Sequence, residues 1–437
     1  MLTPQTNLSK SASKPLVLFL GTRALTLERI AEIATAREGG YEIIMASDTP
    51  ALFQSYGFSH NIYAPLSDYE TSTDCILNYI NEQNLTICGV IGWQDREEEL
   101  TSHLTAKLNL PTCELAANRF ARNKSATRQL LEELGGKYNP KYACVVDLAS
   151  FEDAINKIGT PSLLKPAGNS GGRGIVAVRS PENLADIWEH FYNYNAPSQG
   201  GLYAKYRECD LLEEMLIGSE HSIAGMVVDG EIYLFAIIDK RIDLGLQLQY
   251  ENVLPSTLAP EIQDEVREMA YAVMKSTGIN WRGFHIDFMV TSHGLRILEI
   301  GARPGGECIN SHLIPMASSG EIQPYRLLLD YVIQGKRVPL EQQDYTQTFT
   351  RRVGSRVIAP PSPGKITRLN GLEKICEHPN TRDFTQIAGV GSIMRPPTEA
   401  YEQYKIAYVI AECPLEENLS HIFDRLVSQL EIEISPM

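Results

Sequence analysis

The chain has 437 residues, of which 43% are hydrophobic and 21% are charged. Its 39 basic and 54 acidic side chains give a net charge of −15, which argues against sequence-independent binding of nucleic acids because phosphate backbones need a cationic face. The length predicts roughly two to four domains. The longest early apolar run, residues 16–20, is too short to cross a membrane.

Neither the amino terminus nor the cysteines indicate export. Residues 1–14 lack the apolar core of a signal peptide, and we expect them to be a disordered polar tail. The eight cysteines are scattered and form no C-x-x-C pair. Such scatter is typical of buried or incidental thiols, so we expect a reducing, cytoplasmic location.

The first part of the chain alternates strand-like and helix-like segments. The pattern predicts strands at 16–21, 41–46 and 86–91, and helices at 26–37 and 71–83. This alternation is typical of a parallel sheet covered by helices, so we expect a Rossmann-like α/β domain over residues 15–115. The G-x-G-x-x-G fingerprint is absent after the first strand, which argues against a nicotinamide cofactor.

The pattern changes after a strongly amphipathic segment at 120–134, which we expect to be one helix closed by Gly135 and Gly136. Strands then come in antiparallel pairs. Residues 221–228 and 231–238 flank Asp229-Gly230, a two-residue hairpin signal.

The stretch LLKPAGNSGGRGI, residues 163–175, predicts a strand, a glycine loop and a second strand. Four glycines in seven residues let backbone N–H groups approach an anion, and Lys165 would add a positive charge toward phosphate. A flexible hairpin loop explains the stretch equally well. No G-K-[ST] follows, so it is not a Walker A motif.

A second stretch, LLEEMLIGSE at 211–220, carries acids on an apolar strand and then a glycine bend. Adenine needs an apolar slot with backbone hydrogen-bonding groups, and the carboxylate of Glu220 would suit a ribose diol. Taken alone, the stretch is better explained as a solvated acidic linker.

The third and fourth stretches, FHIDFMV and RILEIGARPGGE, predict a hairpin with Asp287 on the face opposite the core. A three-residue loop, 292–294, would place Asp287 opposite Glu299, with Gly294 in the left-handed position. Facing carboxylates repel without a cation and suit Mg²⁺ with one. Arg303 would add a guanidinium for phosphoryl or carboxylate oxygens. A pair of surface acids and an Arg303–Glu299 salt bridge are the structural alternatives.

Together with the helical stretch RNKSATRQLL, these motifs occur in an order and spacing that resembles the ATP-grasp superfamily over residues 16–335. The resemblance is greatest to carboxylate–amine ligases that join L-amino acids. It implies a multidomain fold of mixed α/β and α+β class, with an ATP-grasp domain at 116–337 that contains a lid subdomain at 138–213. The proline-rich stretch at 360–364 and two later strand-like runs predict a smaller α+β domain at 338–437. The resemblance also implies ATP and Mg²⁺, or Mn²⁺, as cofactors.

The resemblance assigns roles to individual residues. It places phosphate contacts on two lysines and the mobile loop, adenine contacts on the hinge at 213–216, a ribose contact on one acid, and a cation on two others. The residues concerned are Lys124 and Lys165; Ser170, Gly171, Gly172 and Gly174; Glu213, Glu214 and Leu216; Glu220; and Asp287 with Glu299. Arg303 would lie beside the acyl phosphate, and Lys240 is a weaker phosphate candidate.

Two positions depart from the pattern. Many relatives have asparagine as a further metal contact where this chain has Gly301, and glutamate where it has Asp287. We therefore expect either a water ligand or weaker binding of one cation.

The main functional hypothesis is ATP-dependent joining of a small-molecule carboxylate, such as an amino acid, to an amine through an acyl phosphate. The alternatives are a ligase of biotin-carboxylase or purine-biosynthesis type, using bicarbonate or formate, and a non-catalytic ATP-binding regulator. No carrier-lysine motif is evident. We expect no nucleic-acid or membrane partner, and a homodimer is a reasonable expectation. Trp93 and the acidic run at 95–99 precede a predicted helix; they could line a pocket, but we favour the interpretation that they cap the helix.

Overall fold

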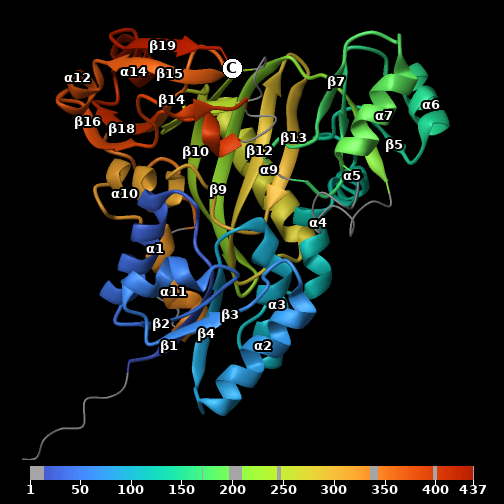
Figure 1. The fold of residues 1–437 in the computed structure, drawn as a ribbon. Coiled ribbons are helices and arrows are strands. Elements are labelled where there is room, and N and C mark those ends of the chain that lie inside the picture. Colours follow the sequence, from blue (N-terminus) through green and yellow to red (C-terminus); the bar gives the residue numbers. More distant parts are fainter. Residues whose placement is uncertain are drawn as a thin grey trace, which may run out of the picture.

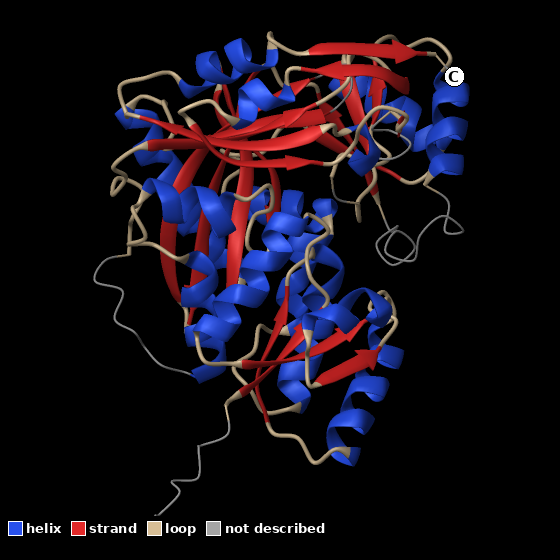
Figure 2. Ribbon diagram, turned by 60° about the vertical axis from the view of Figure 1, so that its left-hand side comes forward, coloured by secondary structure: helices blue, strands red, loops and turns tan. Residues whose placement is uncertain are grey.

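The structure is a computed structural model that describes residues 14–169, 171–195, 209–243, 248–334, 343–396 and 401–436. Figure 1 shows a body built around one long sheet, with the amino-terminal elements at one end, the carboxy-terminal elements at the other, and a small subdomain projecting from its side. Figure 2 shows the same strands in red with helices packed against them. The expected mixed α/β and α+β architecture is confirmed.

The amino-terminal elements form a four-stranded parallel sheet, as the alternating pattern predicted. The strands, in spatial order, are β3 (His60–Tyr63), β2 (Glu42–Ser47), β1 (Leu16–Leu20) and β4 (Ile87–Gly92). Helices α2 (Tyr69–Glu82) and α3 (Glu98–Lys107) cover one face. The other face packs against α1 (Thr26–Glu38) and against the distant α11 (Pro324–Gln334), which joins this sheet to the rest of the molecule.

The predicted helix at 120–134 is two helices. They are α4 (Arg119–Arg122) and α5 (Lys124–Glu133), with Asn123 extended between them at φ −127°. The Asn123 side chain accepts a hydrogen bond from the backbone N–H of Ser125 at 3.0 Å, so it caps the second helix. The single-helix prediction was wrong because an internal N-cap outweighed the continuous apolar periodicity.

The projecting subdomain contains a four-stranded antiparallel sheet with two helices on one side (Figure 1). In spatial order its strands are β5 (Tyr142–Val145), β8 (Asp210–Glu214), β6 (Ser162–Lys165) and β7 (Val176–Val178); its helices are α6 (Leu148–Ile158) and α7 (Leu184–Tyr194). A disulfide joins Cys144 of β5 to Cys209 beside β8. The expectation that all thiols are unpaired was therefore wrong, because the pairing of β5 with β8 brings together two cysteines 65 residues apart.

The long central sheet has eight antiparallel strands. In order they are β13 (Gly294–Gly301), β12 (Arg282–Thr291), β9 (Gly218–Val228), β10 (Glu231–Asp243), β11 (Leu248–Leu254), β14 (Arg352–Ile358), β18 (Ala407–Cys413) and β16 (Thr381–Gln386). The predicted turn at Asp229-Gly230 joins β9 to β10, and both residues have positive φ.

Helices pack on both faces of the central sheet. Helix α9 (Pro260–Thr277) shares a core with Phe284, Ile286 and Phe288 on one face, and α10 (Ile314–Ala317) and α11 lie on the other. The last elements add a small sheet of β17 (Ile393–Met394), β15 (Gly364–Asn370) and β19 (Glu431–Ser435), with α12 (Leu372–Cys376) and α14 (Leu419–Val427). Strands β14, β16 and β18 extend the central sheet, a continuity that the sequence pattern did not reveal. No helix in the described ranges combines the length and the apolar character that crossing a bilayer requires.

Candidate active site

The β12–β13 hairpin presents two acids at one end of the central sheet. Asp287 pairs directly with Glu299, as predicted. The predicted three-residue loop was wrong, because Thr291 pairs with Gly294 and leaves only two residues between the strands. An irregularity between Asp287 and Phe288 restores the pairing by adding one residue on the β13 side. A bulge thus compensates for the shorter turn, which sequence periodicity alone does not indicate.

Each of these carboxylates is matched by a lysine from another element. Lys240 of β10 places its Nζ 2.7 Å from Asp287 Oδ1 and 3.9 Å from Glu220 Oε1. Lys124, the first residue of α5, places its Nζ 3.6 Å from Glu299 Oε2. The structure therefore brings together five of the predicted site residues, each from a different helix or strand.

Three acids in one small region strain the charge balance. Burial, reinforced by Asp287 and Glu299, raises the pKa of Glu220 to about 7, although Lys240 opposes the shift. Burial would lower the pKa of Lys240, but Asp287 and Glu220 raise it overall. Burial lowers the pKa of Lys124, with Glu299 opposing the shift. Three acids thus share contacts with two lysines in this region.

Glu213 is not free to contact a ligand. Its Oε2 accepts a hydrogen bond from Lys165 Nζ at 2.7 Å, and its Oε1 accepts one from Arg128 Nε at 2.7 Å. Burial would raise the pKa of Glu213, but the two cations lower it to about 2. The carboxylate therefore orients Lys165, and only its backbone could face adenine.

Arg128 was missed by the sequence reasoning. It lies four residues after Lys124 on α5, a spacing that places both side chains on one face of the helix. Its Nη2 also donates to the carbonyl of Leu298 at 3.0 Å, next to Glu299. This spacing was the available signal, and Arg128 links the projecting subdomain to the β12–β13 hairpin.

Residues 215–217 connect β8 to β9 and include apolar side chains that are not fully buried. Glu214 accepts a hydrogen bond from the backbone N–H of Lys141 at 2.8 Å, so its side chain secures β8 rather than facing outward. Leu216 is half-buried, and Ile217 is 84% exposed. An exposed isoleucine beside a half-buried leucine provides apolar surface of the kind that an adenine ring covers.

The glycine loop between β6 and β7 has the predicted backbone freedom. Gly171, Gly172 and Gly174 have φ of 66°, 70° and 76°, a region that favours glycine. Ser170 lies outside the described residues. Lys124 Nζ donates to the carbonyl of Asn169, which ties the loop to the start of α5.

Arg303 is held by a partner that was not expected. Its Nε and Nη2 donate to the two carboxylate oxygens of Asp95 at 2.8 and 2.9 Å, and Nη1 donates to the carbonyl of Pro304 at 3.0 Å. Burial would raise the pKa of Asp95, but Arg303 holds it well below the usual range. Three of the five guanidinium N–H groups are used, which leaves two for an oxyanion.

The acidic run at 95–99 was expected to cap a helix, and it does so in part. Glu97 Oε2 accepts hydrogen bonds from the backbone N–H groups of Trp93 and Gln94 at 2.9 and 2.8 Å. Asp95 instead reaches Arg303, 208 residues away in sequence. In the described chain, the alternative Arg303–Glu299 salt bridge is not formed.

A histidine also joins the two hairpin acids. His285, Asp287 and Glu299 can offer one ligand atom each, all within 4.8 Å of one another. Burial, followed by Arg303, lowers the pKa of His285, which favours the neutral imidazole. Two carboxylates and one imidazole in this arrangement fit a divalent cation.

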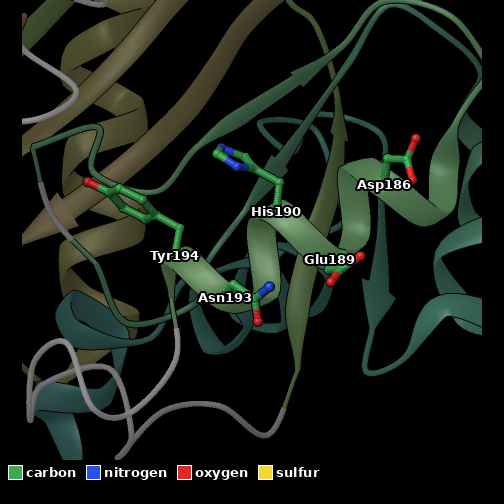
Figure 3. A pocket seen from close by; sticks show the side chains of 5 residues that line it. All are labelled: Asp186, Glu189, His190, Asn193 and Tyr194. Atoms are coloured by element: carbon green, nitrogen blue, oxygen red, sulfur yellow. The ribbon is translucent and has the colours of Figure 1, made fainter.

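A surface hollow lies along one face of α7 in the projecting subdomain (Figure 3). The residues that line it share the spacing of a single helix face and include none of the site lysines or acids: Asp186, Glu189, His190, Asn193 and Tyr194. The hollow is therefore separate from the charged site and contributes nothing to it.

Comparison with known proteins defines the class. Residues 158–311 match the ATP-grasp domain, and residues 356–435 match the L-amino acid ligase C-terminal domain 2. The chain is 25% identical to human carnosine synthase 1 over 288 residues, covering 62% of this chain and 34% of the synthase. It is 26% identical to the alanine–anticapsin ligase of Bacillus subtilis over 252 residues, covering 54% of this chain and 51% of that ligase.

A solved structure shares nearly the whole fold. The L-amino acid ligase of Bacillus licheniformis superposes with a TM-score of 0.78 at 17% identity, covering 97% of this chain and 99% of that one. The matched domains and the shared fold make this chain similar to ATP-grasp ligases that join a carboxylate to an amine. Its carboxy-terminal part is of the kind found in L-amino acid ligases, and it is to these ligases that the chain is similar.

Proposed function

We propose that this protein activates the carboxylate of an amino acid as an acyl phosphate and joins it to the amine of a second small molecule, with release of ADP and phosphate. One observation carries the proposal. Asp287 and Glu299 face each other across the hairpin, and each is matched by a lysine from a different element, at 2.7 Å for Lys240 and 3.6 Å for Lys124. Two adjacent carboxylates with a lysine beside each would suit a nucleotide phosphate chain with its cation.

The residues present fit Mg²⁺ or Mn²⁺. Hard oxygen donors come from Asp287 and Glu299, whose carboxylates face each other across the hairpin, and a divalent cation would relieve their mutual repulsion. When held by Asp287 and Glu299, the cation would neutralise phosphate charge and so weaken the repulsion of an incoming carboxylate. The binding and orientation of the substrates would depend on the side chains of this protein.

The phosphate-binding role falls to the lysines and the glycine loop. Lys165 is fixed by Glu213, and Lys124 is fixed by the carbonyl of Asn169, so both ammonium groups are oriented before ATP arrives. Adenine would lie against Leu216 and the backbone of the hinge, and Glu220 would accept hydrogen bonds from the ribose hydroxyls.

In the first step a substrate carboxylate oxygen attacks the γ-phosphorus, and the bond to ADP breaks. In the second step the amine nitrogen attacks the acyl carbon, the bond to phosphate breaks, and the nitrogen loses a proton. Within the second step, the amine attack gives a tetrahedral intermediate with a negatively charged oxygen. The two remaining N–H groups of Arg303 would bind this oxyanion before phosphate leaves. Asp95 would hold Arg303 in position through its two hydrogen bonds to the guanidinium group.

The acyl phosphate must be kept from water, because hydrolysis would waste ATP. We propose that residues 138–213 act as a lid that closes over the phosphates, within an ATP-grasp domain at 116–337 that lies between domains at 15–115 and 338–437. The positive φ values of Gly171, Gly172 and Gly174 support a loop that can change shape on closure. The reaction would take place in the cytoplasm, where ATP is available.

The competing hypotheses keep the fold but change the chemistry. A bicarbonate- or formate-using ligase is less well supported, because residues 356–435 match a domain of L-amino acid ligases. A non-catalytic ATP-binding protein is less well supported, because the paired acids, the lysines and Arg303 are all present and assembled.

The test is phosphate release from MgATP across pairs of L-amino acids and small carboxylates, with hydroxylamine as a trap. Release that requires a carboxylate and yields a hydroxamate is expected and would identify the acid. An amine that suppresses the hydroxamate and forms an amide would identify the second substrate. ATP binding without carboxylate-dependent release across the panel would contradict the proposal.

A further inference from the structure

His285 lies on β12 two residues before Asp287, so both side chains project from the same face of the strand. It is 8% exposed, which places its imidazole inside the site rather than on the surface. With Asp287 and Glu299 it forms a group of three possible ligands whose atoms all lie within 4.8 Å of one another. No other such group is found in the described part of the chain.

The hydrogen bonding of the ring leaves one nitrogen for a ligand. His285 Nδ1 lies 3.2 Å from the carbonyl oxygen of Arg303. A carbonyl can only accept, so Nδ1 carries the proton and Nε2 keeps its lone pair. Among the described residues, none is hydrogen-bonded to Nε2. A carbonyl that fixes the tautomer from behind is the usual support of a metal-binding histidine.

The opposite strand makes room for this ring. A Cβ on Gly301, which pairs with His285, would lie 2.0 Å from the ring Cε1 and 2.7 Å from each ring nitrogen. The backbone φ of Gly301 is one that other residues also adopt. A larger side chain is excluded there because the imidazole of His285 occupies the space that its Cβ would need. The position of the His285 ring therefore depends on glycine at position 301.

We propose that His285 is a direct nitrogen ligand of the divalent cation held by Asp287 and Glu299, so that this site has mixed nitrogen and oxygen donors. The inference rests on the proposed cation site and deepens it. Magnesium favours oxygen donors, whereas manganese accepts both oxygen and imidazole nitrogen. The imidazole thus shifts the preference of the site from Mg²⁺ toward Mn²⁺.

The test uses Mn²⁺ as the probe, with ADP and the full-length protein, and needs no turnover. Pulsed EPR detects coupling between the Mn²⁺ electron spin and a directly bound nitrogen, and protein containing ¹⁵N-labelled histidine separates this signal from that of adenine. We expect a histidine coupling in the unmodified protein. His285→Ala should abolish it and weaken Mn²⁺ binding about tenfold or more, with a smaller change for Mg²⁺. His293→Ala, at the exposed turn of the same hairpin, is the matched control and should change neither quantity.

Gly301→Ala tests the placement of the His285 ring without changing any of the three proposed metal-binding side chains. The new methyl group should displace the ring, so the histidine coupling should be lost while Asp287 and Glu299 still bind Mn²⁺. Gly305→Ala is the control, since its Cβ would come no closer than 3.4 Å to any heavy atom. Bound Mn²⁺ that shows no histidine coupling would overturn the role of His285 and leave the cation site standing. Absence of Mn²⁺ binding would overturn both.

Discussion

The ion pair between Asp95 and Arg303 makes the sharpest test of how the site is held together, through the substitution Asp95→Asn. Both contacts are short, at 2.8 and 2.9 Å, and the side chains are 19% and 15% exposed. Removing one partner of a buried ion pair costs about 3–5 kcal/mol, and exposed pairs contribute about 0.2–1 kcal/mol. Partial exposure and the retained amide oxygen place the expected cost at about 2–3 kcal/mol, which corresponds to a fall in Tm of about 4–12 °C.

A matched control exists in the same part of the chain. Asp48 accepts a hydrogen bond from Arg96 at 2.9 Å, with side chains 36% and 31% exposed. Asp48→Asn makes the same chemical change at nearly the same distance but in a more solvated setting. It should cost less than about 1 kcal/mol.

The assays are urea unfolding and carboxylate-dependent phosphate release. Asp95→Asn should lower kcat at least about tenfold, because a guanidinium without its carboxylate no longer holds a fixed position for the oxyanion. ATP binding should be unchanged, since Asp95 contacts Arg303 and none of the site lysines. If Asp95→Asn matches Asp48→Asn in both stability and turnover, Arg303 does not depend on this pair, and the reasoning fails.

Four further predictions concern other parts of the structure. Glu299→Gln should abolish phosphate release while circular dichroism and Tm stay unchanged; turnover at the wild-type rate would reject the cation assignment. Burial raises the pKa of Glu98 from 4.5 to about 7, so the stability it contributes is complete below pH 4.5 and is lost as the pH rises through 7. Glu98→Gln should therefore reduce the loss of unfolding free energy, measured with urea, between pH 4.5 and 8. An unchanged dependence of that free energy on pH would contradict this. Glu213→Gln leaves two buried cations without their counter-charge and should destabilise the protein by about 3–5 kcal/mol; unfolding at the wild-type urea concentration would show that the cluster is not coupled. Peptide mapping without reductant should find Cys144 linked to Cys209, and alkylation of all eight cysteines would contradict the disulfide.

The sequence by itself determined the elements whose signals are local. Alternating apolar residues placed Phe284, Ile286 and Phe288 in the core and Asp287 on the opposite face. Asp229-Gly230 fixed a hairpin because both residues tolerate positive φ. The alternation of strands and helices gave the parallel sheet at the amino terminus. These properties depend on neighbours within a few residues, which a sequence displays directly.

Only the tertiary structure decided which acids meet which basic side chains across long stretches of sequence. Asp95 and Arg303 are 208 residues apart, and Glu213 lies 85 residues from Arg128. Nothing local distinguishes such acids from surface acids, so Asp95 was expected only to cap a helix, and Glu213 only to contact adenine. The bulge that aligns Asp287 with Glu299 despite a two-residue turn is likewise set by the whole hairpin. Long-range pairing depends on how elements pack, because a charge finds its partner only after the backbone has brought the two segments together.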